Sequence, residues 1–256
     1  MKIIVALGSG FFAAYLLLPL FFVLGEKVFS APNYQSKRVL NSAGVWLSLS
    51  TIVGSLPLFI WYRDLALLWL FSLSITFLGL LDDLFLEKTK GIRGHLQRLR
   101  SGVITTGVIK LGYILLISFG LALLTQRTNW YLDAFLLSIF ANTVNTLDTR
   151  PNRANFFFGI MLLLVSIFTW DNPITVYSYV VAGSLIVLFP YEKREKTMLG
   201  DSGANLLGAI IGLNLWGLSL GFRIVLAILA LIWQIFADNF SLNRIIDSKR
   251  KIKDKR

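Results

Sequence analysis

Residues 65–83 read LALLWLFSLSITFLGLLDD, an apolar run that ends at the acid pair Asp82-Asp83. A membrane-spanning helix needs roughly 20 predominantly apolar residues, and the chain contains many such runs. Hydrophobic residues make up 55% of the 256 residues and charged residues only 15%, whereas a soluble domain carries about 25% charged residues. The sequence therefore predicts an all-α fold, a polytopic bundle of membrane helices.

We expect about nine transmembrane helices that form one domain over residues 1–243, followed by a basic tail at 244–256. The expected spans are 3–24, 44–62, 65–81, 103–124, 130–147, 155–170, 174–190, 204–220 and 222–240. No internal repeat is evident, which disfavours a transporter built from inverted halves.

The distribution of Lys and Arg predicts the orientation of the bundle. Of the 25 Lys and Arg residues, 20 lie in alternate connections, beginning with 25–43, or in the tail on the same side. Four lie on the opposite side, and Lys110 lies inside a span. Because basic residues gather in cytoplasmic loops, we expect the N-terminus outside and the C-terminus in the cytoplasm. The same bias accounts for the net charge of +11, so we do not expect nucleic acid as a partner.

Acidic residues gather on the side that the basic residues mark as cytoplasmic. Asp82 and Asp83 end the third span, Asp148 follows the fifth, and Asp201 precedes the eighth. Charged groups beside membrane spans are costly and call for a functional explanation. The chain has no cysteine, and His95 is its only histidine, so thiolate and multi-histidine metal sites are excluded. A site at this face would therefore be built from oxygen ligands.

The pair Asp82-Asp83 suits Mg²⁺, which prefers carboxylates together with substrate phosphate oxygens. An ordinary charged helix end explains the pair equally well. Asp201 lies in the turn Leu199-Gly-Asp-Ser-Gly203, where it can cap the eighth helix, although a helix N-terminus also suits phosphate.

Asn142, Asn145 and Asp148 follow one another in steps of three, which places them within roughly 120° of one helix face. Polar groups on a membrane helix must meet other polar groups or water, so they either bind a ligand or join helices through hydrogen bonds. Directly after the acid pair, Lys90 and Arg93 lie in a glycine-containing loop that suits a diphosphate. The bias towards positive loops also explains these two charges.

In this order, the motifs resemble the polyprenyl-phosphate N-acetylhexosamine-1-phosphate transferase superfamily of glycosyltransferase family 4. The superfamily includes phospho-N-acetylmuramoyl-pentapeptide transferase and the undecaprenyl-phosphate GlcNAc-1-phosphate transferases. The resemblance covers residues from about 30 to 215, and its motifs are Asp82-Asp83, Thr89-Lys90-Gly91, Asn142 to Asp148 and Gly200 to Gly203.

The resemblance implies a catalytic membrane domain that transfers a sugar-1-phosphate from a UDP-amino sugar to polyprenyl (undecaprenyl) phosphate. It implies a multi-pass protein of the bacterial plasma membrane, with the site facing the cytoplasm, in cell-wall or surface-glycan synthesis. A homodimer is compatible with it.

It also implies a role for each site residue. Asp201 would bind Mg²⁺, with Asp83 and Asp148 as further ligands, and Asp82 or Asp83 would position or deprotonate the lipid phosphate. Asn142, Asn145 and Asp148 would support the nucleotide-diphosphate site, with Lys90 and Arg93 near its phosphates.

Several features depart from the family pattern. The family's Asp-Gly-x-Asp-Gly continuation reads Asp148-Thr-Arg-Pro151-Asn152 here, so Pro151 replaces the second aspartate. The family's histidine-rich loop and a tenth span are absent, and the part of the first cytoplasmic loop from Lys37 to Gly44 lacks the usual proline. These departures allow a different sugar donor. They also leave open an alternative function, that of a catalytically degenerate homologue that binds lipid phosphate or a partner enzyme. A small transporter is a second one, although its polar groups should be spread through the depth of the bilayer.

Overall fold

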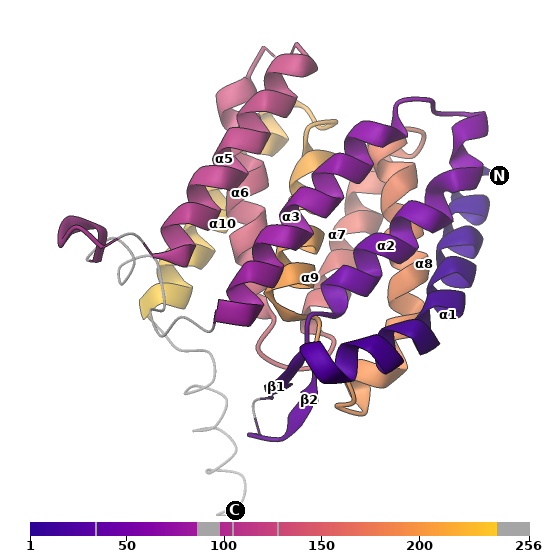
Figure 1. The fold of residues 1–256 in the computed structure, drawn as a ribbon. Coiled ribbons are helices and arrows are strands. Elements are labelled where there is room, and N and C mark those ends of the chain that lie inside the picture. The colour runs from indigo at the N-terminus through magenta and orange to yellow at the C-terminus, as the bar shows by residue number, and fades with distance from the viewer. Residues whose placement is uncertain (34, 86–97, 104, 127, 240–256) are drawn as a thin grey trace, which may run out of the picture.

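The structure is a computed structural model that describes residues 1–33, 35–85, 98–103, 105–126 and 128–239 (Figure 1). Its architecture is an α-helical bundle, as the sequence predicts, and each expected span overlaps a helix, although 44–62 divides into an α-helix and a 3₁₀ helix and the span expected at 204–220 lies at 200–215. The elements are α1 Lys2–Val28, β1 Ser30–Pro32, β2 Arg38–Leu40, α2 Ala43–Ser55, the 3₁₀ helix η1 Leu56–Ile60, α3 Leu65–Phe85, α5 Thr106–Leu124, α6 Trp130–Leu147, α7 Arg153–Thr169, α8 Pro173–Lys193, α9 Gly200–Leu215 and α10 Leu220–Asn239. The basic tail expected at 244–256 lies outside the described residues.

Within the described ranges, five helical segments are long and apolar enough to cross a membrane. They are Lys2–Gly25, Ala43–Ile60, Leu65–Leu84, Pro173–Lys193 and Leu220–Ala237. Together with the shorter apolar helix Arg153–Thr169, these segments indicate a multi-pass membrane protein.

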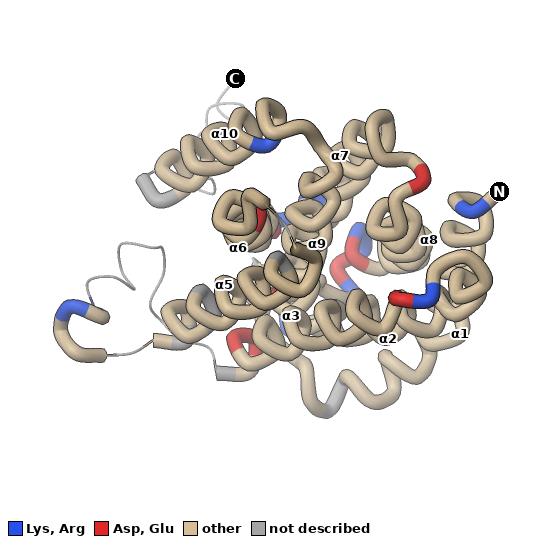
Figure 2. Tube along the Cα trace, turned by 90° about the horizontal axis from the view of Figure 1, so that it is seen from above, with Lys and Arg blue, Asp and Glu red and all other residues tan. Residues whose placement is uncertain are grey.

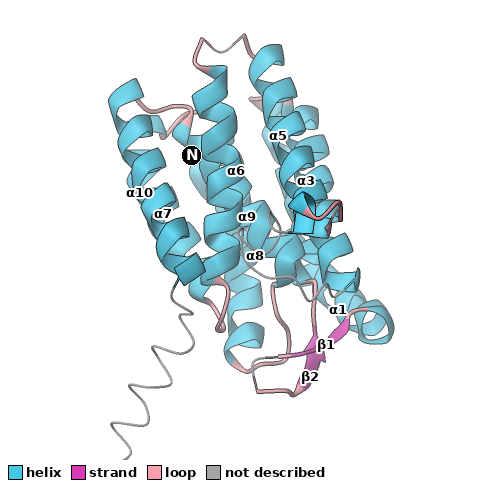
Figure 3. Cartoon of the chain, turned by 90° about the vertical axis from the view of Figure 1, so that its left-hand side faces the viewer, coloured by secondary structure: helices cyan, strands magenta, loops and turns pink. Residues whose placement is uncertain are grey.

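One connection forms a β-hairpin, which the helical pattern of the sequence does not predict. Strands β1 and β2 pair antiparallel, with Ser30 opposite Leu40. Leu40 also pairs in parallel with Thr197, and the Met198 N–H donates to the Leu40 carbonyl at 2.7 Å. The hairpin is therefore held against the α8–α9 connection at one end of the bundle (Figure 3). Because the hairpin's outer partner is more than 150 residues away in the chain, no local pattern signals it.

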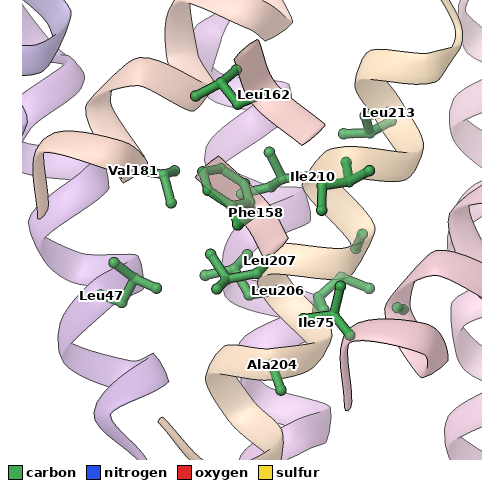
Figure 4. Close-up of a cluster of buried hydrophobic side chains, with 14 of the residues drawn as sticks. Leu47, Ile75, Phe158, Leu162, Val181, Ala204, Leu206, Leu207, Ile210 and Leu213 are labelled. Carbon is green, nitrogen blue, oxygen red and sulfur yellow. The ribbon is translucent and has the colours of Figure 1, made fainter. Parts of the chain in front are cut away.

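Helix α9 is the centre of the bundle (Figure 2). Each of its residues from Ser202 to Leu215 is buried, and α2, α3, α6, α7 and α8 pack around it. Figure 4 shows Leu207 and Ile210 of α9 among side chains of the surrounding helices, with Phe158 of α7 close by. A helix enclosed by other helices on all sides need not match the thickness of the lipid by itself, which explains how a 16-residue helix serves as the core.

Glycine lets α9 approach α6 closely. A Cβ added at Gly208 would collide with the backbone of Phe140 and Ala141, and one added at Gly212 would collide with Leu137. Small residues of this kind allow membrane helices to pack backbone against backbone. The contact between α6 and α9 therefore depends on the absence of side chains at these positions.

Buried polar groups at the far end of α9 find partners on neighbouring helices. The Asn214 side chain donates to the Ser178 hydroxyl at 2.7 Å and accepts from the Thr175 hydroxyl at 3.0 Å. Nearby, buried Arg223 forms an ion pair with buried Asp133, which links α10 to α6. In lipid, unpaired polar groups cost several kcal/mol, so these contacts hold the end of the bundle opposite the hairpin together.

The variant Gly208→Ala should destabilise the protein by about 1–3 kcal/mol, because the new methyl group overpacks the α6–α9 contact. The measurement is the midpoint of thermal unfolding in detergent. Gly159→Ala is the matched control, since a Cβ at that helical position meets nothing within 4 Å and alanine favours helix. Equal midpoints for the two variants would contradict the packing model.

Candidate active site

A cavity of about 290 Å³ lies at the hairpin end of the bundle. Its walls come from four stretches that are distant in the sequence: the hairpin region, the end of α3, the turn after α6, and the stretch from the end of α8 to the start of α9. The lining residues are Pro32, Asn33, Asn41, Asp83, Asp148, Thr149, Arg150, Pro151, Glu192, Glu195, Thr197, Met198, Gly200 and Asp201. Five of these residues are acidic and one, Arg150, is basic, so the described part of the cavity favours cations.

The Asp83 carboxylate caps helix α9 from the end of α3. The backbone N–H groups of Asp201 and Ser202 donate to its two oxygens at 2.8 and 3.1 Å. The Ser42 hydroxyl donates to it at 2.9 Å and the Asn41 amide at 3.3 Å. The first N–H groups of a helix have no partner within the helix, and its N-terminus carries a partial positive charge. Asp83 therefore accepts hydrogen bonds from the first N–H groups of α9 and places a negative charge at the positive end of the helix.

Three glycines allow this close approach. A Cβ at Gly44 of α2 or at Gly79 of α3 would collide with the backbone at the start of α9. Gly200 has a φ of +71°, and a Cβ there would lie 2.7 Å from both the Asn41 Oδ1 and an Asp83 oxygen. The turn that begins α9 is thus fitted between α2, α3 and the hairpin region, with no space for side chains at these positions.

Asp148 ends α6 and lies in the wall of the same cavity. Its pKa is raised well above the ordinary value, first because the group is removed from solvent, and then because the negative charges of Glu192, Asp201 and Asp83 oppose its ionisation. A cation among these carboxylates would relieve that repulsion.

The structure thus brings together Asp83, Asp148 and Asp201, which the sequence predicts to lie at one face. Asp83 lines the cavity but Asp82 does not, because adjacent residues of a helix point in different directions. Asn142 and Asn145 are partly exposed and do not line it either. Lys90 and Arg93, expected near the phosphates, lie outside the described residues.

The capping interaction differs from the expectation for Asp201. The sequence allows Asp201 to cap its own helix. In the structure, the N-cap residue of α9 is Leu199, whose side chain makes no cap hydrogen bond, and the backbone N–H of Asp201 instead donates to the Asp83 carboxylate. Asp201 itself lies in the first turn of α9 and lines the cavity.

The motif pattern misses several residues of the site, among them Asn41, Ser42 and Glu192. Asn41 and Ser42 form a polar pair just before an apolar span, and Glu192 is an acid at the end of another span, on the side that the sequence predicts to be cytoplasmic. A search for all acids at the span ends of this face, rather than for motif positions alone, would have found Glu192.

The donor set fits a divalent cation of the Mg²⁺ type. The carboxylates of Asp148 and Asp201 line the cavity together with Asn41, whose buried Oδ1 has no hydrogen-bond partner. All three are hard oxygen ligands. In the described part of the chain, no cluster of three acids or histidines holds a metal ion by itself. Mg²⁺ is commonly bound by one or two carboxylates together with substrate phosphates, which is the arrangement that these residues fit.

The variant Asp83→Asn should lower the free energy of unfolding by about 1–3 kcal/mol, because its amide group would face N–H donors at the start of α9. Thermal unfolding in detergent measures the loss, and hydrogen exchange should show faster exchange at Asp201 and Ser202. Asp82→Asn removes the adjacent charge and should change both quantities much less. If the two variants behave alike, Asp83 does not cap α9.

A search of curated proteins finds no match to this chain. The family model for glycosyl transferase family 4 matches residues 65–219, which include α3, Asp148 and the turn that begins α9. This match covers more than half of the 256 residues and all five acidic residues that line the cavity. The chain therefore belongs to glycosyl transferase family 4, whose members transfer a sugar phosphate to a lipid phosphate.

Proposed function

We propose that the protein transfers a sugar-1-phosphate from a UDP-amino sugar to polyprenyl phosphate and releases UMP. The observation that carries the proposal is the meeting of Asp83, Asp148 and Asp201, from three separate segments, around one cavity at the end of a membrane bundle. At such a position, a lipid whose chain lies in the bilayer can meet a soluble nucleotide.

In the proposed reaction, a lipid phosphate oxygen forms a bond to the sugar-linked phosphorus of the donor. The bond from that phosphorus to the oxygen bridging to UMP breaks, and UMP leaves with the electron pair. Phosphoryl transfer mainly requires in-line positioning and neutralised charge. The site residues therefore have to position two anions and offset their repulsion.

We assign Asp148 and Asp201 to holding Mg²⁺, with the Asn41 Oδ1 as a further oxygen near the same position. When bound, Mg²⁺ supplies neutralisation of the charge on the diphosphate. Asp83 is occupied by four donors, so in this proposal it acts through the position of α9 rather than as a metal ligand.

The remaining assignments concern the two substrates. Asp82, partly exposed at the same helix end, is the acid of the pair that we assign to the lipid phosphate. Arg150 lies in the cavity wall, where it can attract the donor's phosphates, and Lys90 and Arg93 would add positive charge from the loop after α3. Asn142 and Asn145 would support the nucleotide on the face of α6 next to Asp148.

We further propose that this end of the bundle faces the cytoplasm of a bacterial cell. The basic residues in the connections on this side support that orientation. UDP-sugars would then reach the cavity directly from the cytoplasm, in a pathway for cell-wall or surface glycans.

The test is an assay of purified protein with Mg²⁺, undecaprenyl phosphate and several UDP-sugars, in which UMP is measured. Asp148→Asn and Asp201→Asn should each lower kcat on the order of 100-fold, because each removes a carboxylate that would hold Mg²⁺, whose positive charge offsets that of the substrate phosphates. Asp171→Asn is the control. Asp171 lies in the α7–α8 connection, where it forms an ion pair with Lys2 of α1, and it does not line the cavity.

Failure to release UMP from any UDP-sugar by folded protein would overturn the proposal. Retained binding of undecaprenyl phosphate in that case would favour the catalytically degenerate homologue. Pro151, which lines the cavity where the family pattern has an aspartate, is the feature that motivates this second candidate.

A further inference from the structure

Glu192 is a buried carboxylate to which the proposed chemistry assigns no role. It lies in the last turn of α8 and is 2% exposed, whereas the next two residues, Lys193 and Arg194, are exposed. It also lines the cavity that contains Asp148 and Asp201. Burying a carboxylate costs free energy unless hydrogen bonds or a cation compensate for the lost water. The partners of Glu192 therefore indicate its role.

The two oxygens of Glu192 bind two different segments. Oε1 accepts the Leu199 N–H at 3.0 Å. Oε2 accepts the Asn152 N–H at 3.2 Å and the Asn155 side-chain amide at 2.7 Å. Asn152 is the N-cap residue of α7, and Leu199 is the N-cap residue of α9. One carboxylate therefore joins the starts of two helices.

These two segments carry the proposed metal ligands. Leu199 lies two residues before Asp201, and Asn152 lies four residues after Asp148. Asn152 has a φ of 62°, a left-handed conformation that turns the chain sharply between Asp148 and α7. Glu192 stabilises this turn from outside through the Asn152 N–H, so the position of Asp148 relative to Asp201 depends on a bridge from α8.

We propose that Glu192 is a positioning residue that holds the Asp148 and Asp201 segments at the separation at which both carboxylates share one divalent cation. This inference rests on the proposed metal site and adds to it a residue that touches neither the metal nor a substrate. The negative charge of Glu192 also favours binding of a cation, because it adds to the negative potential at the cavity.

Mn²⁺ binding to the purified protein, in competition with Mg²⁺, tests the inference without depending on activity. Glu192→Gln keeps the size of the side chain but can accept through one oxygen only. We expect it to weaken Mn²⁺ binding about tenfold, the size of effect seen when residues that orient metal ligands are changed. Glu192→Ala should weaken binding at least as much, and hydrogen exchange at Leu199 and Asn152 should become faster.

Glu195→Gln is the matched control. It removes a carboxylate that lines the same cavity three residues away, and its hydrogen bonds run to Asn33 and Gln35 in the hairpin. It should change Mn²⁺ affinity much less than Glu192→Gln. In the UMP assay, Glu192→Gln should raise the Mg²⁺ concentration for half-maximal rate more than it lowers the maximal rate.

All affinities are measured well below the midpoint of thermal unfolding, so that a variant that is less stable is still folded. Unchanged Mn²⁺ affinity in folded Glu192→Gln and Glu192→Ala overturns the inference and leaves Glu192 as a structural cap. If Glu195→Gln weakens Mn²⁺ binding as much as Glu192→Gln does, the inference is also overturned, because the loss of any negative charge at the cavity then explains the effect. Wild-type protein whose Mn²⁺ binding is absent, or is insensitive to Asp201→Asn, overturns the proposed metal site and this inference with it.

Discussion

The contact between the Asp83 carboxylate and the first N–H groups of α9 is the interaction on which the rest of the structure depends. Helix α9 is enclosed by five other helices, so its N-terminus begins inside the protein rather than in water. The unpaired N–H groups of a buried helix end must find acceptors. A carboxylate meets this need with two oxygens and a negative charge opposite the positive end of the helix dipole.

That arrangement also determines how the cavity is formed. Because Gly44 and Gly79 let α2 and α3 lie against the start of α9, Asp201 is held at the cavity wall. A second acid, the buried Glu192, joins the starts of α7 and α9. The acids at this end of the bundle thus divide into two kinds. Asp83 and Glu192 accept N–H bonds and set the shape, while Asp148 and Asp201 provide oxygens to the cavity.

This division changes how the departure at Pro151 is understood. In the family pattern, an aspartate would stand there, close to Asp148. Pro151 and Glu192 both line the cavity here, and Glu192 binds the N–H of the residue that follows Pro151. The cavity is acidic despite Pro151, because Glu192 of α8 lines it together with Asp148 and Asp201. If the proposed function holds, the contacts to the sugar and the nucleotide are the part of the site that Pro151 would change.

The sequence by itself determined the helices of the bundle to within about five residues and the end of the bundle at which Asp83, Asp148 and Asp201 gather. These features depend on local quantities, namely the length of apolar runs and the sidedness of Lys and Arg, so a single chain reveals them. The hydrogen-bond partners of the individual acids were decided by the tertiary structure alone. Asp82 and Asp83 are indistinguishable as neighbours in the chain, yet the helical rotation between them turns only one toward α9, whose amides lie 118 residues away. Glu192 and the hairpin's contact with Thr197 likewise depend on partners brought together by packing, which no local pattern encodes.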